Sequence, residues 1–247
     1  MIARFFSAMG FFGRGWRLAF AGGGLTVFVL LPATITALVT AGGSWAAYHW
    51  ASGWLDRHGA GHGPVAWLAW IALVVVTLMV AYALYAASCV LAAAPFAGVL
   101  SERAEHRATG TPVPPTPFGR AIALGLRGAG QALLGITLYL AIAVPLFLLH
   151  WVAAPLAPFL WIVSLVQTAL FFAFDAFNEP LHRRGASFRA KWRFIGAHLA
   201  ESLGFGLAVA LMMMIPLLSV VVAPVAVVGG TLLFLELEGN KPTRPPV

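Results

Sequence analysis

Uncharged apolar runs, longer than a soluble fold accommodates, dominate this chain. The longest extends from Val65 to Leu100 without an Asp, Glu, Lys or Arg. At about 1.5 Å per residue, a helix of this length exceeds the roughly 30 Å hydrocarbon core of a bilayer. Across the whole chain, 61% of residues are hydrophobic and 9% are charged. These features predict an all-α integral membrane protein, because only helices and closed barrels satisfy their backbone polar groups in lipid.

The other apolar runs predict one more long span and two hairpins. Leu25 to Trp50 is long enough to cross, and its Pro32 falls in the first turns of the expected helix. Residues 51–64 form the expected loop between the two long spans. A block at 129–174 is divided by Pro145, Pro155 and Pro158, and a block at 202–235 is divided by Pro216 and Pro224. Each half has roughly 16 to 19 apolar residues, so these hairpins either cross fully or insert part-way and return. The fold prediction is two long transmembrane helices plus two proline-broken hairpins, in a single membrane domain over residues 1–247.

The two ends of the chain have separate predicted roles. Residues 1–21 combine Phe and Trp with Arg4, Arg14 and Arg17 and contain no acid. That composition predicts an N-terminal helix lying at the bilayer interface, broken near Gly10 to Gly15. Residues 239–247 form a polar tail.

The distribution of basic residues predicts the orientation. Three Arg lie in residues 1–21, four in 101–128, five Lys or Arg in 178–201 and two in 239–247, which leaves only Arg57 elsewhere. Two spans followed by two returning hairpins place all the basic-rich segments on one side. By the positive-inside rule both termini are then cytoplasmic.

The basic segment from Asn178 to His198 contains a short amphipathic helix. Phe188, Trp192, Ile195 and Leu199 recur at helical spacing, with Arg189 and Arg193 on the opposite side. Ser187 stands where an N-cap hydroxyl is expected. Two interpretations remain open and compatible: a helix lying on the membrane with its apolar side towards lipid, or an ordinary basic cytoplasmic loop.

No catalytic motif is present. The chain has no zinc-protease, nucleophile-elbow or phosphate-loop signature, its single Cys89 can form no internal disulfide, and its histidines are scattered. We therefore expect no enzyme activity, no metal and no cofactor. Nucleic acid is not an expected partner, since the basic residues lie in short loops between apolar runs. With no charge inside those runs, a path lined by helix ends and hydroxyls is favoured over a proton-driven carrier.

Several segments together resemble the CysZ-type sulfate permease family, which is related to the eukaryotic etoposide-induced membrane proteins. The similar segments are Phe28–Pro32, Ala94–Glu105, Pro180–Arg189 and Ile215–Thr231. The resemblance implies two long spans plus two partly inserted hairpins, a homo-oligomer in the bacterial inner membrane, and sulfate uptake that feeds cysteine synthesis. In the family, basic residues stand just before the first of these segments, where this chain has Gly24, Leu25 and Thr26.

The predicted function is an inner-membrane permease or channel for sulfate or a similar anion. The alternative is a non-transporting structural, lipid-binding or partner-binding membrane protein of the same fold. The candidate anion-binding residues are Arg14, Arg17, Gly23 and Gly24, with Arg183, Arg184 and Arg189 as a second basic collar. Glu102, Arg103 and Arg107 are candidates for polar residues of a pore or of the interface.

Overall fold

The computed structural model describes residues 1–21, 24–57, 66–110 and 118–239, and all regular structure in them is helical. The helices are α1 (Ile2–Phe20), α2 (Thr26–Arg57), α3 (Ala66–Thr109), α4 (Phe118–Val152), the 3-10 turn η1 (Ala154–Leu156), α5 (Ala157–Arg183), α6 (Phe188–Ala197), α7 (Leu199–Met213) and α8 (Pro216–Gly239). Among the described residues, five helical segments are long and apolar enough to cross a membrane: 26–57, 66–85, 134–152, 157–183 and 218–239. The prediction of an all-α, multi-pass membrane protein is confirmed.

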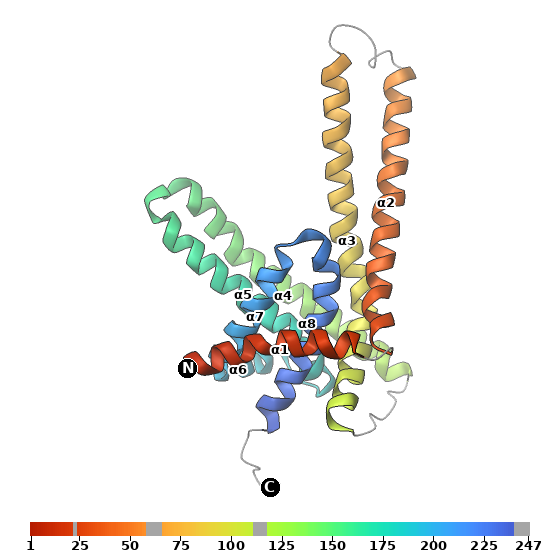
Figure 1. The fold of residues 1–247 in the computed structure, drawn as a ribbon. Helices are drawn as coiled ribbons and strands as arrows, with labels where there is room; N and C mark the ends of the chain where they lie inside the picture. The colour runs from red at the N-terminus through yellow and green to blue at the C-terminus, as the bar shows by residue number, and fades with distance from the viewer. Residues whose placement is uncertain (22–23, 58–65, 111–117, 240–247) are drawn as a thin grey trace. The chain divides into compact units, whose positions relative to one another are not determined.

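Residues Val27–Phe96 form one compact unit, made of α2 and the first part of α3. Within it the two helices run antiparallel, side by side (Figure 1). Their close approaches include Phe28 with Phe96, whose rings are 6.3 Å apart, and Gly43 with Leu84. The two long helices were predicted. The predicted loop at 51–64 is wrong in part, because α2 continues through Trp54 to Arg57. That stretch contains no proline to stop the helix.

Residues Met1–Thr26 and Ala97–Val247 form a second compact unit, in which α8 is central. In the most apolar 18-residue stretch of its segment 218–239, 67% of the residues are buried, against at most 22% in the corresponding stretches of the other candidate spans. Helices α1, α5 and α7 pack around it at glycines: a Cβ added at Gly15 would lie 2.6 Å from Cα of Gly229, and one at Gly230 would lie 2.7 Å from Cβ of Ala176. Small residues of this kind let helix backbones approach closely.

Helix α1 is continuous from Ile2 to Phe20, so the predicted break near Gly10 to Gly15 is wrong. Glycine inside a helix costs about 1 kcal/mol relative to alanine, but a helical residue without a side chain is what the contact of Gly15 with Gly229 requires. Packing therefore overrides the weak local preference.

The hairpin breaks fall at only some of the predicted prolines. Pro145 lies inside α4 and Pro224 inside α8, so neither divides its block. The chain instead turns at 153–156 and at 214–215, next to Pro155 and Pro216. Proline inside an apolar helix is tolerated where neighbouring helices and local adjustments compensate for the missing hydrogen bond.

Candidate functional site

A basic cluster forms where the end of α1 meets α3 inside the second unit. Arg103 Nη1 donates a hydrogen bond of 3.2 Å to the carbonyl of Gly24, and Arg107 Nη1 donates one of 3.4 Å to the carbonyl of Leu18. Both arginines are exposed, and so is Arg17 in the last turn of α1. We call Gly24, Arg103 and Arg107 the basic cluster.

Gly24 lies against both arginines. A Cβ placed there would lie 3.3 Å from Arg107 Nη2 and 3.9 Å from Arg103 Nη1. From the sequence, Gly24 was a candidate anion-binding residue, whereas Arg103 and Arg107 were candidate polar residues of a pore or of the interface. The structure brings the three residues together. Arg103 and Arg107, from a distant helix, thereby supply positive charge beside the segment 24–26, which itself has none.

The other predicted anion ligands near the N-terminus are placed differently. Arg14 lies 3.6 Å from Glu236 in an exposed ion pair, with its guanidinium 4.4 Å from the centre of the Phe11 ring. Exposed ion pairs are worth at most about 1 kcal/mol, so this interaction leaves Arg14 able to reorient. Gly23 lies outside the described residues.

Arg183 and Arg184 take part in an ion-pair network with acids of α3 and α8. Both donate to the carboxylate of Glu105, Arg184 at 2.9 Å, and Arg184 also lies 3.1 Å from Glu238. Arg183 further donates to Ser101, whose hydroxyl accepts from Thr231 of α8. The network joins the ends of α3, α5 and α8, and much of the charge of the predicted second collar is balanced by acids. Glu102 is partly buried beside it on α3.

Helix α6 begins as predicted, with the Ser187 hydroxyl accepting from the amide of Ala190 at 3.3 Å. Its apolar side packs against α5: the Trp192 ring stacks on Phe174 at 5.1 Å. The predicted face does not include Leu199, because α6 ends at Ala197 and the chain bends by 99° into α7.

Lys191 on α6 is a buried cation that the sequence analysis missed. Its ammonium donates a hydrogen bond of 2.6 Å to Asn178 Oδ1 on α5. Burial lowers the pKa of Lys191 to about 8, while the neighbouring Glu179 acts in the opposite direction. A signal was present: Lys191 is three residues after Phe188 and four before Ile195, which places it on the apolar face.

Three hydroxyls recur every four residues along α2 in the other unit. The oxygens of Thr36, Thr40 and Ser44 are buried and have no hydrogen-bond partner among the described residues. Hydroxyls at this spacing share one face of the helix and can line a polar path. In the described part of the chain, no three His, Cys, Asp or Glu side chains gather as potential metal ligands.

Comparison with known proteins gives a consistent result over nearly the whole chain. Residues 11–224 match the family model described as sulfate transporter CysZ/etoposide-induced protein 2.4. The chain is 26% identical to the sulfate transporter CysZ of Pectobacterium atrosepticum, over 97% of this chain and 90% of that protein. It is also 26% identical to the sulfate transporter CysZ of Salmonella typhimurium, over 93% of this chain and 92% of that protein.

Proposed function

Because the chain belongs to the family of sulfate transporter CysZ and etoposide-induced protein 2.4, we propose that it is a sulfate permease of the bacterial inner membrane. The observation that carries the proposal for this chain is the basic cluster. There Arg103 and Arg107 reach the carbonyls of Gly24 and Leu18 from another helix. The relatives named sulfate transporter match this chain almost end to end, which supports the same substrate class.

The basic cluster has the chemistry that sulfate needs when it leaves water. A dianion sheds its hydration shell only where several charge-assisted donors replace it. The guanidinium groups of Arg103, Arg107 and Arg17 are exposed at one end of α1 and provide such donors. In this proposal Arg14 adds to the local positive potential, and Arg183 and Arg184 act mainly by fixing α5 to α3.

The remaining parts of the proposal concern location and assembly. The permease is a homo-oligomer with both termini in the cytoplasm, and the sulfate it admits feeds cysteine synthesis. The distribution of basic residues supports the orientation. The buried hydroxyls of α2, which have no hydrogen-bond partner among the described residues, favour a passive path over proton coupling.

The test is uptake of radiolabelled sulfate into proteoliposomes containing the purified chain. Replacing Arg103 and Arg107 by Gln removes charge-assisted hydrogen bonds to the anion. For each bond removed, the sulfate concentration that gives half-maximal uptake should rise about tenfold. Arg57→Gln, which removes one exposed arginine at the far end of α2, is the matched control and should leave uptake unchanged. Folded protein that gives no uptake above empty vesicles would overturn the proposal.

A further inference from the structure

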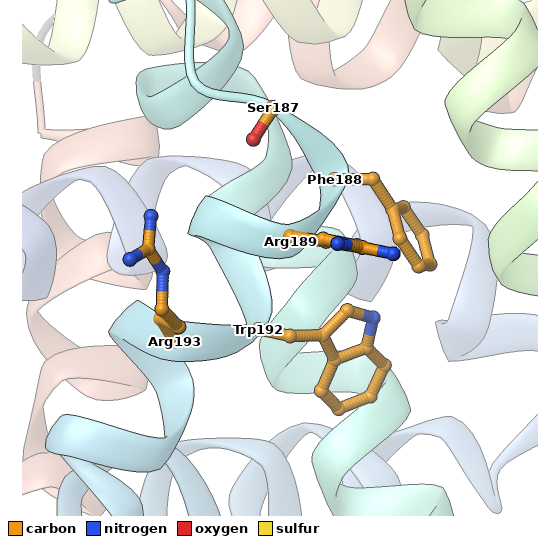
Figure 2. A pocket seen from close by; sticks show the side chains of 5 residues that line it. All are labelled: Ser187, Phe188, Arg189, Trp192 and Arg193. Carbon is orange, nitrogen blue, oxygen red and sulfur yellow. The ribbon is translucent and has the colours of Figure 1, made fainter.

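A surface hollow on α6 is not used by the proposed transport site. It has a volume of about 640 Å³ and is lined by Ser187, Phe188, Arg189, Trp192 and Arg193 (Figure 2). In Figure 2 the guanidinium of Arg189 extends on the same side as the rings of Phe188 and Trp192, and Arg193 points to the other side. The hollow therefore combines an aromatic wall with two cationic groups.

Three of the side chains that line this hollow carry hydrogen-bond donors. Arg189 and Arg193 are exposed, and the described residues form no ion pair with either. The indole Nε1 of Trp192 is buried and has no hydrogen-bond acceptor among the described residues. An unpartnered buried donor is uncommon and calls for an acceptor, which the described residues do not supply. The hydroxyl of Ser187 already caps the helix.

The position of α6 decides which acceptor the hollow meets. It follows the charged end of α5 at Arg183 and leads directly into the apolar helix α7. Helix α6 therefore lies where a membrane-spanning segment reaches the bilayer surface. Partly exposed Trp and Phe rings beside arginines are typical of that depth, because the rings suit the acyl boundary and the cations suit the headgroups.

We propose that this hollow binds an anionic phospholipid. The headgroup phosphate accepts from Arg189 and from the indole N–H of Trp192, and the first part of an acyl chain lies along the rings of Phe188 and Trp192. Arg193, on the other side of α6, adds positive charge that attracts the anionic headgroup. The buried face of α6 is held by α5 through Phe174 and Lys191, so the helix presents a preformed surface to the lipid. The lipid would brace the junction between α5 and α7 whether or not sulfate is being transported.

The test is a titration of the purified full chain in detergent with dioleoylphosphatidylglycerol or dioleoylphosphatidylcholine, read by native mass spectrometry. A basic residue near an anionic headgroup contributes roughly fivefold in affinity, so the wild type should prefer phosphatidylglycerol by on the order of 25-fold. Arg189→Gln with Arg193→Gln should abolish that preference. Trp192→Phe, which keeps the ring and removes the donor, should weaken phosphatidylglycerol binding several-fold.

Two controls make the outcome decisive. Arg57→Gln removes the same charge outside the hollow and should keep the full preference, and melting temperatures confirm that each variant is folded. Equal binding of the two lipids by the wild type would overturn the proposal. So would an unchanged preference for phosphatidylglycerol in the double variant, or a preference that falls as much in Arg57→Gln as in the double variant. Displacement of phosphatidylglycerol by millimolar inorganic phosphate would also overturn it, because the hollow would then be a site for a free anion.

Discussion

Gly15 of α1 and Gly229 of α8 are in direct backbone contact, so that a Cβ added to Gly15 would lie 2.6 Å from both the Cα and the N of Gly229. Gly229 is equally constrained from its own side, since a Cβ there would lie 2.9 Å from the carbonyl oxygen of Phe11. The N-terminal helix is therefore fixed to the most buried helix of its unit by the absence of two side chains.

We predict that Gly15→Ala lowers the stability of the protein by about 1–3 kcal/mol, because backbone atoms must move to admit the methyl group. Gly10→Ala is the matched control on the same helix: nothing lies within 4 Å of its added Cβ. There the better helix propensity of alanine should leave stability unchanged or raise it by up to about 1 kcal/mol. Thermal unfolding of both variants in detergent checks this, and equal effects would contradict the close approach of the two helices.

The sequence predicted helices and their order well, and their close contacts poorly. The Ser187 cap could be predicted because an N-cap is a local interaction between a hydroxyl and an amide three residues later. The contact of Gly15 with Gly229 could not, since nothing in a single sequence pairs residues that far apart. The same limit applies to the basic cluster, where Arg103 was predicted as polar but not as a neighbour of Gly24.

Glu105 is the acid that connects α3 to the two arginines at the end of α5, and its side chain is only 18% exposed. We predict that Glu105→Gln destabilises the protein by about 1–3 kcal/mol, because the partly buried Arg183 loses its counter-charge and Arg184 keeps only Glu238. Glu102→Gln, on the same helix and without an ion pair among the described residues, should change stability by less than about 0.5 kcal/mol. A double-mutant cycle of Glu105→Gln with Arg183→Gln measures the coupling directly, and a coupling of zero would contradict the network.

The buried Lys191 should make the stability of the protein depend on pH. Its pKa in the folded protein is about 8, below the ordinary 10.5, so between these values the unfolded chain binds more protons than the folded one. The free energy of unfolding of the wild type relative to Lys191→Met should therefore rise from about pH 8 to about pH 10, by at most about 1.4 kcal/mol per pH unit. Arg189→Met changes a residue on the exposed side of the same helix. The difference in free energy of unfolding between the wild type and this variant should not change with pH, because arginine stays protonated throughout. Parallel curves for the wild type and Lys191→Met would show that the lysine is not buried.

The proposed orientation predicts which sites face the outside. In a Cys89→Ser background, Ser52→Cys at the end of α2 should react with a membrane-impermeant maleimide in intact spheroplasts. Ala186→Cys, between α5 and α6, should react only after lysis, because the basic-rich segments stay in the cytoplasm. The reverse pattern would invert the topology.

The hydroxyls of Thr36 and Thr40 on α2 distinguish a polar path from simple packing. Each is buried without a hydrogen-bond partner among the described residues, so replacing the pair by Val keeps the shape and removes only unsatisfied oxygens. Stability should then be unchanged or slightly raised, because an unsatisfied buried polar group contributes a penalty of about 1–3 kcal/mol. If the hydroxyls line the path of the anion, sulfate flux in proteoliposomes should nevertheless fall about tenfold or more. Thr34→Val is the control, since that hydroxyl is already bonded to the carbonyl of Leu30 at 2.9 Å on the exposed side. Unchanged sulfate flux in the double variant would show that these hydroxyls do not line the transport path.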